Sequence, residues 1–421
     1  MKKIILSLIL IGILKAFVEV PPGWRHRKLV SWHNCLGTEG ICISSKGDTI
    51  VKVFIAPISD TTDMEVGVFF TYSYDAGFTW ALASLVDSGM SEFLNFPQIV
   101  IDCSSRIYVA FRKHTSSDEL YVYVSEDMGN TWRLSYHVIS SLNQGIPSHW
   151  IANYQNKVGL IYEEYTFHGF VYTFYLCFTY TEDGGYSWIE REIFSVCDSI
   201  HTGLRLVIDP GENFYVYTSM YQWQEGPERG VMRLYKRISP NLWFGWDLPV
   251  SVIFSGLPNR IIRPDPNIPD VIYFIYSTGY TYNEVYYIKF RNGQFSDPVY
   301  ITEGKFSDFV KENNERIYAI IGKEGPSYEI LTYHWASYDD GQTWKLIGHL
   351  DTCRYFYYEK NKRGRGLALI SFIPQSSYGK PNYHGNDDYS ISNKYNATAY
   401  NSNKHLVRVP NTDDLYMVFS M

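Results

Sequence analysis

One eight-residue pattern occurs four times in the chain, and this repeat restricts the possible folds more than any other feature. The copies are Ser73–Trp80, Ser125–Trp132, Thr181–Trp188 and Ser337–Trp344, with the consensus Ser/Thr-x-Asp-x-Gly-x-Ser/Thr-Trp. Their aspartates, Asp75, Asp127, Asp183 and Asp339, are 52, 56 and 156 residues apart, and 156 is three times 52. A sequence that repeats at one period predicts an array of similar structural units.

The long interval before the last copy predicts two degenerate units. Trp243, in Ile238–Trp243, and Phe295, in Phe290–Phe295, stand where the aromatic residue of the repeat is expected. From Trp80 through these two residues to Trp344 the spacings are 52, 56, 55, 52 and 49 residues, so six units are visible.

The octapeptide suits a tight turn between two antiparallel strands. Its Gly supplies a positive φ, its Asp carboxylate accepts hydrogen bonds from backbone N–H groups, and its Trp buries a large ring in the next strand. Apolar strands recur between the turns, at Ile107–Phe111, Val158–Tyr162, Phe214–Tyr217, Val271–Ile275 and Ile317–Ile321. Units of about 40 to 50 residues with four strands each are typical of β-propeller blades.

Composition agrees with an all-β fold and excludes several functions. Aromatic residues make up 17% of the 421 residues and favour strands, while 45% apolar and 19% charged residues exclude a disordered chain. A formal charge of -7 without a long basic run excludes a nucleic-acid partner. The six cysteines form no C-x-x-C pair, so neither a zinc site nor another cofactor is implied.

The N-terminus is typical of a secretory signal peptide. Met1–Lys3 precedes the apolar run Ile4–Leu14, which is shorter than the roughly 20 residues that span a bilayer. We expect a signal peptide over residues 1–17 and a secreted or cell-envelope protein, with no membrane insertion after the signal is removed. A retained signal anchor is the alternative.

Over residues 27–350 the sequence resembles the Asp-box, or BNR, repeat proteins, which include sialidases and many propellers that are not enzymes. The resemblance implies that each box lies in the turn between the third and fourth strands of a blade, away from the face that binds substrate. It therefore implies a structural role, without metal, for Asp75, Gly77 and Trp80, Asp127, Gly129 and Trp132, Asp183, Gly185 and Trp188, and Asp339, Gly341 and Trp344.

We predict an all-β protein with one β-propeller of four-stranded antiparallel blades over residues 18–390. Seven blades fit slightly better than the six of the family's sialidases, because seven periods of 52 residues make 364, from about residue 27 to about residue 390. In this arrangement Arg27–Ser31 supplies the outer strand of the last blade. Residues 391–421 form a linker and an extra hairpin, either an additional unit or the truncated start of a second one.

The face opposite the boxes is expected to carry the ligand site. The loops expected there contain Trp32, His33, Asp60, Asp63, Arg112, Lys113, His114, His149, Trp150, Glu163, Glu164, His168, His201, Arg205, Tyr221, Trp223, Glu225, Arg260, Arg263, Tyr280, Tyr282, Glu284 and Arg354. Flat aromatic rings beside hydrogen-bonding groups suit a sugar, which makes Trp150, Trp223, Arg260 and Tyr280 ligand-binding candidates. Aromatic residues that only cap the blade ends are the alternative.

The sialidases of this family hold the substrate carboxylate with three Arg and use a Tyr nucleophile activated by a Glu, with an Asp as the acid. The resemblance implies Arg205 and Arg263 as two of the Arg, Asp60 or Asp63 as the acid, and Tyr282 with Glu284 as the nucleophile pair. The match is incomplete, because the Arg-Ile-Pro motif that carries the first Arg is missing from Trp24–Lys28.

The sequence favours a ligand-binding module whose partner is a glycan or a surface protein. An exo-acting glycoside hydrolase of the sialidase type and a structural surface-assembly protein are the alternatives. The sequence leaves the oligomeric state open.

Overall fold

The described part of the chain consists of strands and short connections. The computed structural model describes residues 24–25, 41–47, 49–58, 65–74, 79–90, 94–114, 117–140, 145–168, 171–197, 201–222, 229–237, 250–255, 260–278, 284–304, 306–311, 315–324, 330–353, 355–360, 366–371, 404–408 and 415–419. These residues form seven sheets, numbered here sheets 1 to 7 in chain order. Within this part of the chain, no helix is long and apolar enough to cross a membrane.

Sheets 1 to 3 each contain four consecutive antiparallel strands. Sheet 1 holds β2 (Ile41–Lys46), β3 (Thr49–Pro57), β4 (Glu65–Ser73) and β5 (Ser84–Met90). Sheet 2 holds β6 (Leu94–Ile101), β7 (Ile107–His114), β8 (Asp118–Ser125) and β9 (Arg133–Ile139). Sheet 3 holds β10 (Ser148–Tyr154), β11 (Lys157–His168), β12 (Val171–Thr181) and β13 (Glu192–Cys197).

Sheets 4 to 6 repeat the plan. Sheet 4 holds β14 (His201–Ile208), β15 (Phe214–Gln222), β16 (Arg229–Lys236) and β17 (Val250–Ser255). Sheet 5 holds β18 (Arg260–Pro264), β19 (Val271–Thr278), β20 (Glu284–Arg291) and the short β21 (Gln294–Phe295), and β22 (Val299–Glu303) also pairs with β20. Sheet 6 holds β23 (Phe306–Lys311), β24 (Ile317–Glu324), β25 (Ile330–Ser337) and β26 (Lys345–Cys353).

Sheet 7 contains strands from both the N-terminal and the C-terminal regions of the chain. It holds β27 (Tyr355–Lys360), β28 (Gly366–Ser371), β29 (Lys404–Arg408), β30 (Leu415–Phe419) and β1 (Trp24–Arg25), which runs parallel to β30. The two C-terminal strands, expected from the sequence as an extra hairpin, pair with each other and with β28. Arg27–Ser31, expected as an outer strand, lies outside the described residues.

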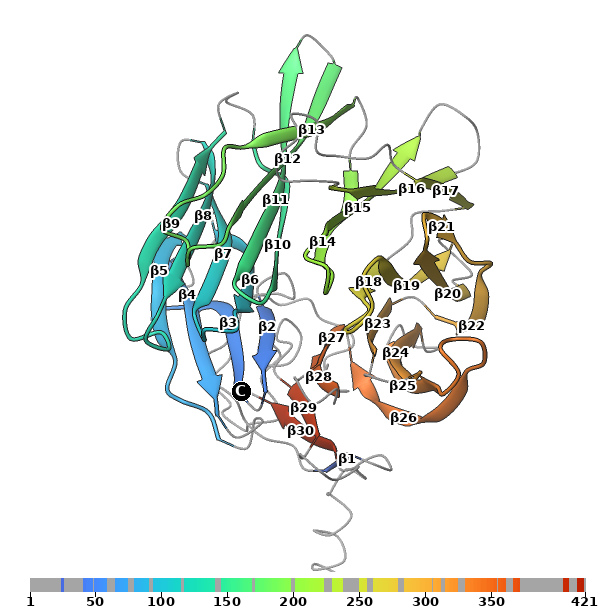
Figure 1. The fold of residues 1–421 in the computed structure, drawn as a ribbon. Coiled ribbons are helices and arrows are strands. Elements are labelled where there is room, and N and C mark those ends of the chain that lie inside the picture. Colours follow the sequence, from blue (N-terminus) through green and yellow to red (C-terminus); the bar gives the residue numbers. More distant parts are fainter. Residues whose placement is uncertain are drawn as a thin grey trace, which may run out of the picture.

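The sheets follow one another around a common centre in chain order (Figure 1). The first strand of each sheet contacts the first strand of the next, from β2 through β6, β10, β14, β18 and β23 to β27, and β27 contacts β2. Four-stranded antiparallel sheets in radial repetition are the arrangement of a β-propeller. The predicted all-β architecture of four-stranded antiparallel sheets is thus confirmed in outline, and sheets 5 and 7 each carry a fifth strand.

The apolar runs found in the sequence are the second strands β7, β11, β15, β19 and β24. Every side chain from Ile107 to Phe111 is fully buried, and so are nearly all those of the other four runs. A second strand lies between two strands of its own sheet, and neighbouring sheets cover both of its faces. Clusters of buried residues accordingly lie between successive sheets, as where Val66, Val68 and Phe70 of sheet 1 pack with Val109 and Phe111 of sheet 2.

Three octapeptide copies fall in described turns, each between the third and fourth strands of its sheet. In sheet 3, Asp183 accepts hydrogen bonds from the Thr181 hydroxyl at 2.9 Å and from the Ser187 N–H at 3.0 Å, and the Thr181 hydroxyl accepts one from the Gly185 N–H at 3.0 Å. The same bonds recur around Asp127 and Asp339. Asp75 and Gly77 lie outside the described residues.

The degenerate unit of sheet 5 replaces the octapeptide with a tighter turn. Asn292 and Gly293, with φ of 53° and 78°, join β20 to β21, as in two-residue hairpins with two positive-φ residues. Phe295 still packs where the repeat predicts an aromatic residue, with its ring 5.4 Å from that of Phe274 and 5.2 Å from that of Phe290. Trp243 lies outside the described residues.

The octapeptide turns of sheets 3 and 6 also pack against the preceding sheet. The Arg133 guanidinium of sheet 2 donates to the Gly185 carbonyl oxygen at 3.0 Å, and the Trp188 indole N–H donates to the Ser135 hydroxyl at 2.9 Å. In sheet 6 the Asp340 carbonyl oxygen accepts a hydrogen bond from Tyr287 of sheet 5 at 3.1 Å. These turns therefore form hydrogen bonds between neighbouring sheets at one end of the molecule.

Candidate functional site

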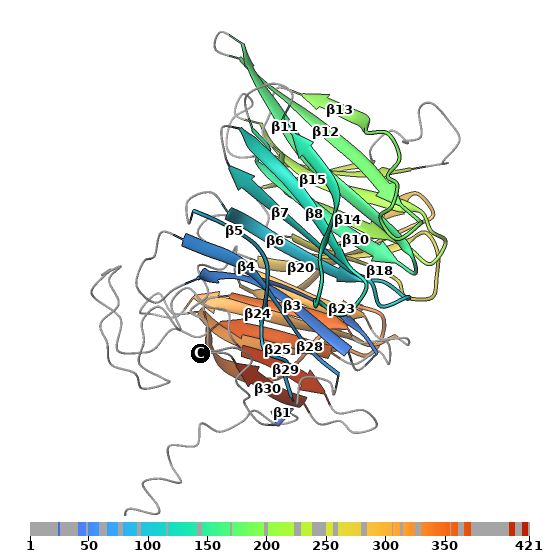
Figure 2. The same cartoon turned by 90° about the vertical axis from the view of Figure 1, so that its left-hand side faces the viewer.

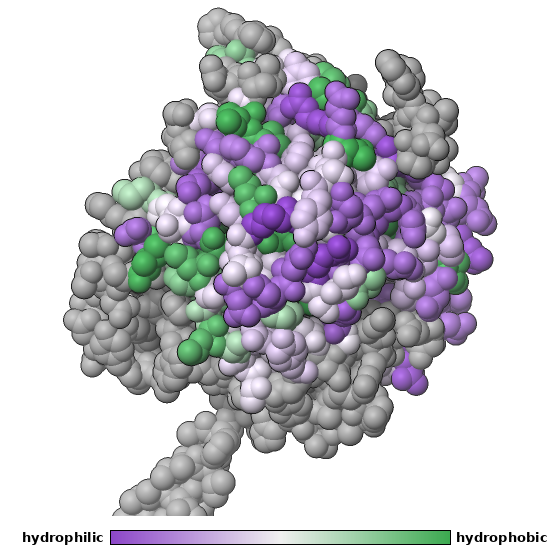
Figure 3. Space-filling model, turned by 60° about the vertical axis from the view of Figure 1, so that its left-hand side comes forward, coloured by the Kyte–Doolittle hydropathy of each residue, from purple (hydrophilic) through white to green (hydrophobic). Residues whose placement is uncertain are grey.

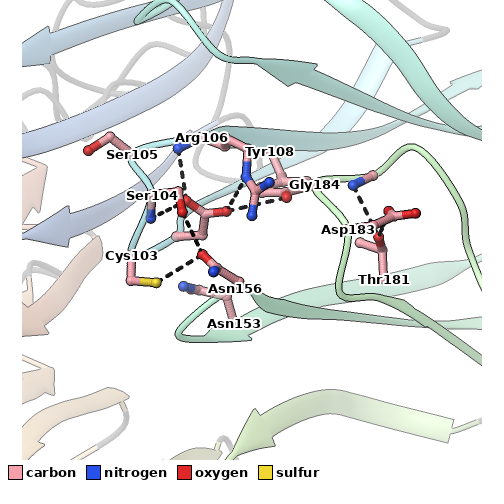
Figure 4. Close-up of polar contacts among 12 residues, drawn as sticks. Cys103, Ser104, Ser105, Arg106, Tyr108, Asn153, Asn156, Thr181, Asp183 and Gly184 are labelled. Carbon is pink, nitrogen blue, oxygen red and sulfur yellow. Dashed lines mark hydrogen bonds and ion pairs between the residues drawn. The ribbon is translucent and has the colours of Figure 1, made fainter.

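The turns between first and second strands lie at the same end as the octapeptides. In sheet 2, the fully buried Asp102 accepts hydrogen bonds from the Ser104 N–H at 2.8 Å and from the Arg106 side chain at 2.7 Å. Figure 4 shows this turn beside the Asp183 turn of sheet 3. Asp209 and Asp265, also buried, organise the corresponding turns of sheets 4 and 5. These aspartates were not predicted, although an Asp directly after an apolar first strand is a visible signal in the sequence.

The opposite end, called here the ligand end, receives the loops between second and third strands and the connections from sheet to sheet. A close arginine–aromatic contact joins the first strands of sheets 3 and 4. The Arg205 guanidinium of β14 stacks 4.0 Å from the ring centroid of Trp150 on β10, and both side chains are half-buried. Both residues were candidates in the sequence, and the structure brings them together.

Polar groups of sheet 3 extend this stack. Ser148 lies two residues before Trp150 and therefore on the same face of β10, since side chains alternate along a strand. Its hydroxyl donates a hydrogen bond to Glu163 of β11 at 3.3 Å. Glu163 is 1% exposed. The Trp150 indole, the Ser148 hydroxyl and the Glu163 carboxylate thus lie on the face of sheet 3 that the Arg205 guanidinium of sheet 4 contacts.

A β-bulge precedes Arg205. Thr202 lies opposite Ser219 whereas Arg205 lies opposite Tyr217, so β14 carries one extra residue, and Gly203 in this bulge has a φ of 69°. Bulges redirect side chains and are common next to functional sites. The bulge therefore helps to set the direction of Arg205, and regular strand alternation in the sequence could not reveal it.

A second arginine–aromatic contact follows the same pattern in sheet 2. The Arg112 guanidinium lies 5.1 Å from the ring of Phe96, which sits in a bulge of β6 at a φ of 54°. Arg112 also donates to the Ile146 carbonyl oxygen at 2.8 Å. Gln98, just after the bulge, donates to the His149 carbonyl oxygen at 2.8 Å and accepts from the Ile151 N–H at 2.9 Å, which ties β6 to β10. The sequence analysis missed Phe96 and Gln98, although a Gln within an apolar strand is a visible signal.

His149 lies on β10 beside Trp150 and points to the other face of the strand. It is 4% exposed. Burial, assisted by the Arg112 guanidinium, lowers the pKa of His149 from 6.5 to about 4. The imidazole is therefore neutral at neutral pH.

The other candidates are placed as follows. Arg263 lies on β18, the first strand of sheet 5, and donates to the Phe309 carbonyl oxygen of β23 at 3.3 Å. Arg260 is the first residue of the same strand. Trp223, Tyr280, Tyr282, Asp60 and Asp63 lie outside the described residues.

Glu284 begins β20 and is exposed. Its carboxylate accepts a hydrogen bond from the Tyr286 hydroxyl at 2.7 Å. This bond, and then burial, raises the pKa of Tyr286 to about 12, so the phenol stays protonated at neutral pH. The described contact of Glu284 is thus with Tyr286, whereas its expected partner Tyr282 is not among the described residues.

Several residues expected in loops lie within strands instead. His149, Trp150, Glu163, Glu164, Arg205 and Arg263 all belong to β10, β11, β14 or β18. These strands extend further toward the ligand end than the apolar runs in the sequence indicate. Glu164 is buried and forms an ion pair at 2.8 Å with Arg191, which directly precedes β13 of the same sheet.

The aspartates of the octapeptides organise turns at the end opposite the ligand end. Hydrogen bonds from Ser187, Thr181 and the backbone outweigh desolvation and lower the pKa of Asp183 to about 2. No group of three or more His, Cys, Asp or Glu that could hold a metal ion occurs among the described residues.

We expect Asp183→Ala to destabilise the protein by about 1 kcal/mol, because the loss resembles that of a helix N-cap. The Trp150–Arg205 contact should stay unchanged, because Asp183 lies at the opposite end of the molecule. Thermal unfolding and the intrinsic Trp fluorescence of the same sample check both expectations. A variant that unfolds at the same temperature as the wild type would contradict the structural role.

Comparison with known proteins is informative for the fold. No protein-family model and no curated protein matches the sequence. Among solved structures, an ulvan lyase of polysaccharide lyase family PL25 matches with a TM-score of 0.54 and 10% identity, covering 82% of this chain and 93% of that one.

Two further structures match with lower scores. An α-L-arabinofuranosidase from Fusarium graminearum has a TM-score of 0.47 and 13% identity over 72% of this chain and 93% of that one. A sialidase from Trypanosoma rangeli has a TM-score of 0.42 and 10% identity over 70% of this chain and 54% of that one. Sheet arrangement and the likeness to the lyase together define the class, a β-propeller.

Proposed function

We propose that this chain is a secreted, carbohydrate-binding β-propeller of the Asp-box type, with its glycan site at the ligand end between sheets 3 and 4. The observation that carries the proposal is the stack of Arg205 on Trp150, with Ser148 and Glu163 on the same side of sheet 3. The shared fold with an ulvan lyase supports a carbohydrate as the ligand.

The chemistry of the stack suits a sugar. Sugar rings combine apolar C–H faces with hydroxyl groups, so aromatic rings and well-placed polar groups bind them together. Trp150 supplies the aromatic surface and Arg205 supplies donors, while the buried Glu163 carboxylate holds the Ser148 hydroxyl beside them. Since Trp150 and Arg205 sit on first strands held by two sheets, the site is built before a ligand arrives, which lowers the entropic cost of binding.

We also propose that the propeller has seven blades. Seven sheets in the described residues, each touching the next by its first strand, support this number. The contact between β27 and β2 supports closure of the ring.

A catalytic role at the same end is the second candidate. Arg205 and Arg263 lie on β14 and β18, the first strands of adjoining sheets that contact each other. Two arginines on adjoining first strands suit a carboxylate group of the substrate, which would have to draw their guanidinium groups away from Trp150 of sheet 3 and Phe309 of sheet 6. Turnover of a fluorogenic sialoside that Arg263→Ala abolishes would favour this second candidate over a binding module.

We expect Trp150→Ala to weaken glycan binding at least tenfold, which corresponds to about 1.4 kcal/mol. The wild-type chain and the variant are applied to an array of neutral and acidic glycans, and the best ligand is titrated. Tyr186→Ala is the matched control, because Tyr186 carries an Arg133 stack at 4.3 Å in an octapeptide turn. Equal losses in both variants, or no selective binding by the wild type, would contradict the proposed function.

A further inference from the structure

The hairpin of β11 and β12 is the longest in sheet 3 and carries a strip of four aromatic rings. The two strands have 12 and 11 residues, and Figures 1 and 2 show the hairpin projecting beyond its neighbours at the ligand end. Tyr165 lies opposite Phe174, and Phe167 lies opposite Tyr172. The Phe167 and Tyr172 rings are 4.6 Å apart, and those of Tyr165 and Tyr172 are 5.9 Å apart.

The aromatic strip continues the proposed glycan site. Residues 161, 163, 165 and 167 share one face of β11 because side chains alternate along a strand. Trp150 lies opposite Ile161, and Ser148 lies opposite Glu163. One face of sheet 3 therefore runs from the Trp150–Arg205 stack past Glu163 to the tip of the hairpin.

The outer rings of the strip remain accessible. Phe167 is 38% exposed and Tyr172 is 48% exposed, whereas Phe174 is 5% exposed and supports them from the base. Exposed apolar residues elsewhere, such as Leu85, Leu134 and Ile193, lie on separate outer strands, and Figure 3 shows the apolar surface of that side as patches divided by polar residues. Contiguous exposed rings at a ligand end indicate a binding surface.

The length of the strip indicates the kind of ligand. Glu163 and Phe167 are four residues apart on one strand, which is about 13 Å. One monosaccharide cannot reach both the stack and the tip.

We propose that the β11–β12 hairpin is a second subsite, which binds a further sugar of the same glycan chain through Phe167 and Tyr172. This inference rests on the proposed function, and it makes the ligand an oligosaccharide or polysaccharide in place of a single terminal sugar. Flat rings at both subsites hold the chain by its apolar sugar faces, and the groups beside Trp150 supply the hydrogen bonds.

The test compares polymers with their short fragments. The full chain is titrated with ulvan and its disaccharide, arabinan and arabinobiose, and polysialic acid and sialic acid. The double variant Phe167→Ala/Tyr172→Ala should bind the polymer that the wild type binds about tenfold more weakly, with unchanged affinity for the fragment. Phe167→Leu/Tyr172→Leu, which keeps apolar cover but removes the flat rings, should show the same selective loss, and Tyr338→Ala, an exposed Tyr at the opposite end, should show none.

The outcomes separate the two proposals. If the wild type binds polymer and fragment and the hairpin variants keep both affinities, the second subsite is wrong and the proposed function stands. If the hairpin variants lose polymer and fragment alike while their unfolding temperature is unchanged, the subsite is not separate and the inference also fails. If the wild type binds none of the six probes, both proposals fall.

Discussion

Replacing Gly341 by Ala should lower the free energy of unfolding by about 3 kcal/mol, because two costs add. Gly341 has a φ of +90° in the octapeptide turn of sheet 6, where a residue with a side chain is strained. A Cβ at this position would also overlap the Tyr287 ring of sheet 5. That ring is 3% exposed and held by its bond to the Asp340 carbonyl oxygen, so it cannot move aside easily.

Gly293→Ala separates the two costs. Gly293 has a φ of +78°, and nothing lies within 4 Å of a Cβ added there, so this variant bears only the conformational cost of about 1 kcal/mol. Unfolding by urea, followed by Trp fluorescence, measures both variants against the wild type. An equal loss of unfolding free energy in the two variants would mean that the contact between the octapeptide turn of sheet 6 and Tyr287 of sheet 5 does not contribute to stability.

Stability should fall steeply below pH 6.5 because His149 is buried in its neutral form. The pKa of His149 is about 4 in the folded chain and 6.5 as an unperturbed group. Between these values the unfolded chain binds a proton that the folded chain does not, so its contribution is fully present above pH 6.5 and is lost as the pH falls to 4. The two pKa values correspond to about 3 kcal/mol over this window.

His149→Gln should flatten this dependence, whatever its effect on stability at neutral pH. The measurement is the urea midpoint of unfolding at several pH values between 4 and 7.5, for the wild type and the variant. His114→Gln is the control, because the His114 side chain is 48% exposed. Parallel profiles for the wild type and His149→Gln would show that another group causes the acid lability.

The repeat made the fold predictable, because its turns leave a local signature. Asp127, Asp183 and Asp339 need only neighbours within their own octapeptide for most of their hydrogen bonds. In the degenerate unit of sheet 5 an Asn-Gly turn replaces the octapeptide, but the Phe295 ring still packs against Phe274. The pairing of β1 with β30 joins residues far apart in the chain, and the repeat period predicted an N-terminal outer strand at Arg27–Ser31 instead of at Trp24–Arg25.

The site was less predictable because its residues come from different sheets. Trp150 and Arg205 are 55 residues apart, and only the packing of β10 against β14 brings them together. The bulges at Phe96 and Gly203, which redirect nearby side chains, break the alternation on which strand patterns depend. With 37 Tyr in the chain, the aromatic strip of β11 and β12 could not be distinguished from ordinary blade packing.

The most direct test of the proposed glycan site is a crystal structure of the full chain with the best array ligand bound. We expect sugar density against Trp150 and Arg205, between sheets 3 and 4, with a hydrogen bond to the Arg205 guanidinium or the Ser148 hydroxyl. Sugar density at the octapeptide end, with the Trp150–Arg205 stack unoccupied, would contradict it.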